Sequence, residues 1–408
     1  MAFAGTRGSG DWGTDERPKN FREGILWLNP NGSAPLFAMM SKSRKQSVND
    51  PEFAWWEETL ENARLQINDG TGYTATSTSL TVDAVSALPT NITAGGLNLV
   101  VGDVLMVEKT ETATYDNEIM IVSSITSDTV VVVKRGQAGT TAAGIADNTP
   151  LLRIGSAHAE GASLPSLSAR NPTKVFNYTQ IFRTVYGTTK TADATFARTG
   201  DAYNNDRKRK MFDHSNKMEW AFLFGQKNEN TTVGATSGSP LRYTGGVREF
   251  LTTNVKIYTT SPTEDDFLDQ ISPIFDYQED SGAGNERFVL AGNGFLNNIN
   301  KVARNSSSSR INFDGTIKLY GMELQKWVLP QGTLGIKTHP LMSTHARFTN
   351  SAFFLDFSNL IYRPLRDTKN NDDVQAKGED SRKGEWITET GLMLEHERTM
   401  AYLGNFVV

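Results

Sequence analysis

Few residues of this chain have the types and spacing that catalysis or metal binding requires. The chain has no cysteine, which excludes disulfides, thiolate metal sites and cysteine nucleophiles. Its five histidines are His158, His214, His339, His345 and His396. No two of them have the i, i+4 spacing of a helical zinc site, and on a strand the flanking Glu395 and Glu397 would point away from His396. The sequence therefore predicts no metal, no cofactor and no catalytic residue.

Motifs for phosphate binding and sugar hydrolysis are also missing. The chain has no GxxxxGK loop followed by Ser or Thr, and Gly282 and Gly284 lack the third glycine and the preceding strand of a dinucleotide fingerprint. Carboxylates are plentiful, but none pairs in a recognisable glycosidase motif. These absences favour a protein whose function is association and not an enzyme.

A run of four basic residues could contact phosphate. It comprises Arg207, Lys208, Arg209 and Lys210. On a helix such a run is usually the solvated face, and that interpretation stands beside the functional one. With 41 basic and 46 acidic residues the net charge is −5, so the chain as a whole has no drive toward nucleic acid and any DNA contact is predicted to be local.

Composition indicates a soluble protein with a sizeable core. The 408 residues are 38% hydrophobic and 21% charged, which suits one large core or two to three smaller ones. No apolar run approaches the roughly 18 residues of a membrane span, and the first ten residues, MAFAGTRGSG, lack the core of a signal peptide. We therefore predict a cytoplasmic product with no membrane contact.

The residues from Thr199 to Lys227 predict one long helix, around which the rest of the chain is organised. Thr199 or Asp201 can cap its start, Gly225 lies where it can end, and its length would be roughly 40 Å. Met211, Met218, Ala221, Phe222 and Gly225 recur along one stripe, which predicts a packed face. The basic run lies largely outside that stripe.

The segments before this helix are extended. Residues 1–50 read as an arm whose apolar side chains, Trp27 and Phe37 among them, pack either on the chain's own core or on a neighbouring subunit. Residues 51–67 carry Phe53, Trp55 and Trp56 and predict a strand or ribbon covered on both sides. From Tyr73 to Ile154 the runs SLTVDAV, DVLMVEK, EIMIVSSI and TVVVVKR predict a small separate β unit inserted in a larger domain.

The segments after the helix mix α and β character. Thr263 is a predicted N-cap, and Pro273 is expected to kink or split the helix that follows it. RFVLAGN is predicted as a buried strand, and Phe295, Ile299 and Val302 as one face of a helix. The densely charged stretch from Arg366 to Glu385 is predicted as a solvated loop.

The order of these parts resembles the major capsid proteins of tailed phages with the HK-97 fold. The closer likeness is to the SU-10-type major head proteins. It is carried by PLFAMMSK at 35–42, FAWWEETL at 53–60, VKRGQAGTTAAGIADNTPLLRIG at 133–155, NYTQIFRTVYGTTKTADA at 177–194 and YGMELQKWVLPQGTLGIKTHPLM at 320–342. The segments RYTGGVREFL and FFLDFSNLIYRPL and the last strand, which ends in AYLGNF, continue it. The resemblance covers nearly the whole chain, through the order and spacing of the motifs and not through any single one.

The resemblance implies an α+β, HK-97-like capsid fold with an inserted small β domain. Residues 1–50 would be the N-terminal arm, and 51–69 with 156–175 the two limbs of the extended loop. Residues 70–155 would be the β-rich insertion domain. Residues 176–239 with 343–408 would be the peripheral domain with the spine helix at 200–226, and 240–342 would be the axial domain.

The resemblance also implies the function and the partners. Hexamers and pentamers of the chain would close into an icosahedral shell around double-stranded DNA, in a virion assembled in the host cytoplasm. Portal, a separate scaffolding protein and a decoration protein are the further partners expected. Trp27, Phe37, Phe53, Trp55 and Trp56 are the expected subunit-interface anchors, and the basic run the candidate DNA-facing group. Residues 51–69 contain no lysine, so covalent crosslinking of the kind some relatives perform is not expected.

Two other functions fit part of the pattern. A tail-tube or adaptor subunit shares the assembly logic but fits the long helix less well. A glycan-binding or glycan-hydrolysing surface protein could use the Thr- and Gly-rich β unit, but it would need paired carboxylates or a tryptophan platform. The seven tryptophans are scattered along the chain instead.

Overall fold

The computed structural model describes residue 36 and residues 44–58, 64–84, 99–109, 116–127, 129–165, 172–232, 238–277, 285–305, 313–319 and 322–408. The chain forms two compact units. Unit 1 comprises Met1–Phe53 and Phe176–Val408, and unit 2 comprises Ala54–Val175. The predicted arm residues Trp27 and Phe37 lie outside the described residues.

Unit 2 contains a closed antiparallel barrel. Its strands, in the order in which they pair, are β3 (Arg64–Ile67), β4 (Ser79–Ala84), β7 (Val130–Gln137), β6 (Ile119–Ile125), β5 (Asp103–Val107) and β8 (Pro150–Ser156). Alternate side chains point inward and form a core of valine, leucine, isoleucine and methionine. The four strand runs predicted from the sequence are β4 to β7. The strands β3 and β8 close the barrel. Strand β3 lies within residues 51–69, the segment assigned to the first limb of the extended loop.

A two-stranded ribbon joins the two units along the chain. It consists of β2 (Glu52–Glu57) and β9 (Thr173–Tyr178), and the boundary between the units falls inside both strands. Beyond β9 the chain continues into the long strand β10 (Gln180–Thr189), the short helix α2 (Lys190–Ala194) and then α3 (Ala202–Phe224).

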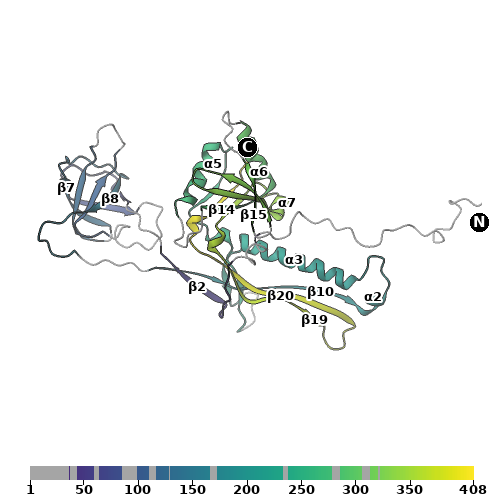
Figure 1. Cartoon of the computed structure of the whole chain (residues 1–408). Helices are drawn as coiled ribbons and strands as arrows, with labels where there is room; N and C mark the ends of the chain where they lie inside the picture. The colour runs from purple at the N-terminus through teal and green to yellow at the C-terminus, as the bar shows by residue number, and fades with distance from the viewer. Residues whose placement is uncertain are drawn as a thin grey trace, which may run out of the picture. The chain divides into compact units, whose positions relative to one another are not determined.

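The first sheet of unit 1 has the strand order β1 (Arg44–Lys45), β19 (Leu360–Asp372), β20 (Ser381–Leu394) and β10. The helix α3 runs along it (Figure 1). The prediction of a solvated loop from Arg366 to Glu385 was wrong, because most of this stretch lies in the paired strands β19 and β20. Some of its charges form cross-strand ion pairs, such as Arg366 with Glu389 at 2.6 Å, so charge density did not indicate a loop.

The helix α3 has the caps that its sequence predicts. Asp201 accepts hydrogen bonds from the backbone N–H groups of Tyr203 and Asn204, and Gly225 is the C-cap. Met218 and Phe222 are buried as predicted, but Met211 is 48% exposed, so the predicted stripe was wrong at that position. The N-terminal half of the helix is buried at Tyr203 and His214.

The second sheet of unit 1 has seven strands. In order they are β13 (Val255–Ile257), β21 (Ala401–Gly404), β18 (Ala352–Leu355), β14 (Glu286–Ala291), β17 (Thr333–Thr338), β16 (Met322–Val328) and β15 (Phe313–Leu319). Phe353 and Leu355 face one core and Phe354 the other, so strands of this sheet are apolar without interruption. The first core also takes in α3, which therefore packs against both sheets of unit 1.

Short helices cover the second face of this sheet. Thr263 caps α5 (Glu264–Ile271) in a capping box with Asp266, and the 3-10 turn η1 (Ser272–Phe275) that contains Pro273 follows, which confirms the predicted break. The inward face of α6 (Asn293–Asn305) carries Phe295, Ile299 and Val302, all buried as predicted. The remaining elements are the hairpin β11 (Asn228–Asn230) and β12 (Leu241–Tyr243), the helices α4 (Val247–Phe250) and α7 (Pro340–Thr344), and the turns η2 (Phe357–Asn359) and η3 (Glu397–Thr399).

Candidate assembly interface

The predicted anchors on the ribbon differ in exposure. Phe53 and Trp55 are buried, at 8% and 7% exposed, whereas Trp56 is 66% exposed. The sequence predicted cover on both sides, but within one chain only the Phe53 and Trp55 side is covered. Trp56 is therefore the β2 aromatic whose ring the chain itself leaves exposed.

The two buried anchors are engaged within their own chain. The ring of Phe53 lies against the backbone of Gly391, where a Cβ would come within 2.6 Å of it, and 5.9 Å from the guanidinium of Arg363. The indole N–H of Trp55 donates to Glu57 Oε1 at 2.6 Å. These contacts fix the ribbon locally and leave Trp56 as the ribbon aromatic that another subunit can cover.

The structure divides the basic run on α3 into two pairs. The guanidinium of Arg207 lies 5.8 Å from the ring of Trp386, whose indole N–H donates to the Arg207 carbonyl at 3.2 Å. The Lys210 ammonium lies 3.1 Å from Asp213. Lys208 and Arg209 are exposed. The surface that can meet phosphate is therefore narrower than the run of four suggests.

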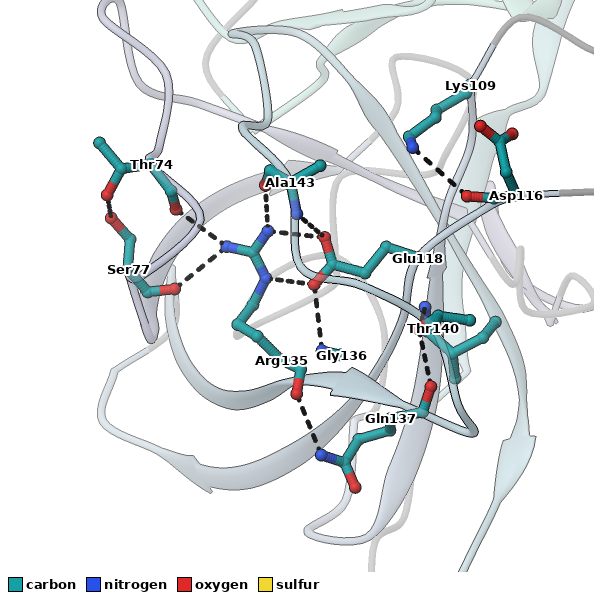
Figure 2. Close-up of polar contacts among 11 residues, drawn as sticks. Thr74, Ser77, Lys109, Asp116, Glu118, Arg135, Gly136, Gln137, Thr140 and Ala143 are labelled. Carbon is teal, nitrogen blue, oxygen red and sulfur yellow. Dashed lines mark hydrogen bonds and ion pairs between the residues drawn. The ribbon is translucent and has the colours of Figure 1, made fainter.

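A buried ion pair ties three loops together at one end of the barrel. Glu118 and Arg135 have side chains 1% and 5% exposed, and two hydrogen bonds of 2.6 and 2.7 Å join the guanidinium to the carboxylate. The remaining Arg135 N–H groups donate to the carbonyls of Thr74, Ser77 and Ala143 at 3.2, 3.1 and 2.5 Å. Figure 2 shows the guanidinium between these carbonyls and the carboxylate. All five donors of the guanidinium are thus used.

The carboxylate of this pair stays ionised despite its burial. Burial alone would raise the pKa of Glu118, but the hydrogen bonds from Arg135 and from the backbone N–H groups of Ala143 and Gly136, with the charge of Arg135, hold it below its usual value. Those N–H groups lie 3.1 and 3.2 Å from the carboxylate oxygens. The network is a structural clamp, because the guanidinium and the carboxylate make their hydrogen bonds with each other and with the surrounding backbone.

A second clamp holds the start of α3 on the sheet. The hydroxyls of Tyr203 and Tyr186 donate to Asp372 Oδ1 at 3.0 and 3.1 Å, and the guanidinium of Arg382 lies 4.0 Å from the Tyr203 ring. Burial and the bond to Asp372 raise the pKa of Tyr203, and the same bond lowers the pKa of Asp372. Tyrosine therefore remains the donor and the carboxylate the acceptor.

The buried histidines of unit 1 have structural partners. The ring nitrogens of His214 lie 3.1 Å from the Thr184 hydroxyl and 2.8 Å from the Thr388 hydroxyl, and burial lowers the pKa of His214 to about 4. His339 lies 2.7 Å from Glu219. Across the described ranges, no group of three or more side chains is placed to hold a metal ion.

Sequence reasoning missed these buried polar groups. Arg135 ends one apolar strand run and Glu118 begins another. In the sequence, both look like the charged residues that commonly flank a strand. Glu219 was read as part of the spine helix without a partner, because the residue that it meets is 120 positions away. The one available signal was a charged residue inside an otherwise apolar stretch, which costs stability unless it is paired.

Comparisons with known proteins bear on the whole chain. The sequence model of the SU10 major capsid protein family matches residues 4–406. A curated relative, the major capsid protein of Pseudomonas phage PaMx41, is 29% identical over 370 residues, which cover 88% of this chain and 82% of the relative. None of the helices in the described ranges combines the length and the apolar content that crossing a membrane requires.

Solved structures with similar chains include a capsid and a phage structure. The match to a chain from the capsid of a native GTA particle covers 98% of this chain and 98% of that chain, at 9% identity and a TM-score of 0.44. The chain from Microbacterium phage Oxtober96 matches 95% of this chain and 96% of its own length, at 10% identity and a TM-score of 0.42.

Proposed function

This chain belongs to the SU10 major capsid protein family, and on that premise we propose that it self-assembles as hexamers and pentamers into the icosahedral shell that encloses the double-stranded DNA of a tailed phage. The family places it among structural proteins of the virion, with the α+β, HK-97-like fold class that the sequence predicted. In this role the chemistry is association through repeated, symmetric contacts.

The exposed Trp56 on the β2–β9 ribbon carries the proposal. A buried aromatic at the centre of an interface typically contributes about 2 kcal/mol or more, so covering this ring would supply a large share of one contact. Phe53 and Trp55 support the contact by fixing the ribbon from its covered side. Trp27 and Phe37 stay proposed anchors on the arm.

Replacing Trp56 with alanine is expected to weaken assembly and leave the subunit folded. Loss of about 2 kcal/mol at one contact corresponds to roughly thirtyfold weaker association at that contact. The same loss is repeated at every equivalent contact of a capsomer. Sedimentation velocity across a concentration series measures the shift from assembled to unassembled material, and far-ultraviolet circular dichroism checks the fold.

Ala54→Ser is the matched control, because residue 54 is exposed on the same face of β2 but carries no ring. The control should assemble as the native chain does. If Trp56→Ala assembled with unchanged concentration dependence, the ribbon would not be the contact that this proposal requires.

For the DNA-facing surface we propose Lys208 and Arg209 as the phosphate contacts of the basic run. Arg207 and Lys210 stay in the proposed group with smaller shares, since both are half-buried whereas Lys208 and Arg209 are exposed. The contact would be weak and non-specific, because each neutralised phosphate contributes through counterion release and not through base recognition.

Changing Lys208 and Arg209 together to glutamine is expected to lower the salt dependence of duplex binding. The slope of log affinity against log salt should fall in magnitude by about 2, one for each lost phosphate contact. Fluorescence anisotropy with a labelled duplex measures it, with Lys210→Gln as the comparison of smaller expected effect. An unchanged slope would assign the run to the solvated face of the helix.

The remaining partners and boundaries are proposed from the family alone. A portal, a separate scaffolding protein and a decoration protein would complete the particle, and assembly would take place in the host cytoplasm. The arm, extended-loop, insertion, peripheral and axial segments keep the boundaries predicted from the sequence. The barrel would face outward, where a decoration protein could reach it.

A further inference from the structure

A buried carboxylate on the spine helix holds the backbone of the N-terminal arm. The N–H of Leu36 donates to Glu219 Oε1 at 2.8 Å, and both residues are 0% exposed. The Leu36 side chain belongs to the same core as Met218 and Phe222 of α3. The arm therefore meets the helix through a polar contact and an apolar contact at one residue.

A second partner of this carboxylate fixes its role as an acceptor. His339 Nε2 lies 2.7 Å from Glu219 Oε1, and His339 Nδ1 accepts the N–H of Met342 at 3.3 Å as the cap of α7. A ring nitrogen that accepts carries no proton, so the proton of the neutral ring is on Nε2 and is donated to Glu219. His339 thus orients the carboxylate toward the arm.

A second anchor holds the arm further along the chain. Strand β1 pairs in parallel with β19, and the N–H groups of Gln46 and Val48 donate to the carbonyls of Tyr362 and Pro364 at 3.0 and 3.1 Å. The guanidinium of Arg44 donates to the Ser358 carbonyl at 2.7 Å. This edge pairing holds residues 44–48 without any contribution from Glu219, so the two anchors can be separated experimentally.

We propose that Glu219 is the docking site for the chain's own arm, with Leu36 as the residue it captures and His339 as the residue that positions the carboxylate. A buried carboxylate is costly unless donors satisfy it, so undocking the arm would remove a donor and uncover the core below Leu36 at the same time. Docking at this position is therefore favoured over a free arm. The proposal goes beyond assembly and holds for the unassembled subunit.

The test is amide hydrogen exchange at Leu36 in the unassembled full-length chain. In Glu219→Met the side chain keeps its length, but it has no oxygen to accept the N–H of Leu36 or the proton of His339 Nε2. The amide exchange rate at Leu36 is expected to rise about tenfold or more, because one hydrogen bond to a charged group is lost. The exchange rate in β14 should stay as in the native chain. His339→Gln should give a smaller rise at the same amide.

Two controls separate docking from general stability. Asp213→Asn changes an exposed carboxylate on the same helix and should leave Leu36 unaffected, whereas Leu36→Ala keeps the N–H but loses the apolar contact and should speed exchange there. Unchanged exchange at Leu36 in Glu219→Met would overturn the proposal. An equal rise at Leu36 and in β14 would also overturn it, because Glu219 would then be a general core residue. Neither result depends on whether shells form.

Discussion

Replacing Arg135 with alanine is expected to destabilise the barrel by about 3–5 kcal/mol, the loss typical of removing one partner of a buried ion pair. The change leaves Glu118 charged and buried, with its side chain 1% exposed, and frees the carbonyls of Thr74, Ser77 and Ala143 from their donor. Arg135→Lys should recover only part of the loss, because an ammonium offers three donors where the guanidinium offers five.

Amide exchange in β6 and β7 of the full-length chain measures this loss. The expected change is an acceleration of roughly a hundredfold or more, since about 1.4 kcal/mol is a factor of ten. Exchange in β14 of unit 1 serves as the internal reference. Arg153→Ala is the matched control on the same barrel, because Arg153 lies 3.7 Å from Asp103 and is partly exposed, and such pairs contribute about 1 kcal/mol or less. Equal effects of the two changes would contradict the role given to Arg135.

The same pair predicts how the barrel responds to acid. Because the folded pKa of Glu118 lies below its unfolded value of 4.5, the unfolded chain binds more protons in that window. The contribution of Glu118 to stability is therefore present above about pH 4.5 and is lost as the pH falls through the folded pKa. Arg135→Ala should remove this dependence from the exchange of β6 and β7.

Replacing Arg287 with alanine is the second change with a large expected effect. Its side chain is 1% exposed, and its guanidinium donates four hydrogen bonds of 3.1 to 3.3 Å, to the carbonyls of Glu286, Thr399, Ile274 and Tyr277. Its Nη1 also forms an ion pair with Asp356 Oδ2 at 3.1 Å. The alanine variant leaves Asp356 charged beneath the sheet and detaches η1 from β14. A loss of about 3–5 kcal/mol in unit 1 is expected.

Urea denaturation followed at 222 nm reports this loss selectively, because the described helices α2 to α7 all belong to unit 1. The midpoint should move to lower urea with little change in slope. Arg242→Ala is the comparison, since Arg242 and Glu229 form a partly exposed pair at 2.8 Å on the hairpin β11–β12. A midpoint for Arg287→Ala that matches the Arg242 variant would show that the buried network adds little.

Local signals made part of the fold predictable. The helix α3 was identified from its caps, Asp201 and Gly225, because a cap acts within one turn of its own residue. The break after α5 followed from Pro273, whose ring and missing N–H act at that position. The barrel strands were visible as short Val- and Ile-rich runs, because a closed barrel buries one side of every strand.

The errors came from packing between distant segments. Met211 was placed on the packed stripe because its spacing from Met218 fits a helical face, but the buried residues of the N-terminal half of α3 are Tyr203 and His214, and Met211 is 48% exposed. The stretch from Arg366 to Glu385 was read as a loop because its charges gave no hint of their partners on other strands, such as Arg183 of β10 with Glu385 at 2.5 Å. Such pairings exist only once the sheet has formed.

The candidate interface was predictable in kind but not in detail. Three aromatics within residues 53–56 indicated a contact surface, and only the strand's pairing shows that Trp56 faces outward while Phe53 and Trp55 are held by their own chain. The sequence left open whether the arm packs on the chain's own core or on a neighbouring subunit. Within the described residues Leu36 packs on the chain's own core.

Electron microscopy of the purified chain, with sedimentation on the same sample, tests the central claim most directly. The chain is examined alone and after co-expression with the proteins encoded beside it, because a scaffolding partner is among the proposed requirements. Closed shells or rings of five and six subunits are the predicted result, and Trp56→Ala should reduce both. A stable monomer that forms neither under any of these conditions would contradict the assembly function proposed for this chain.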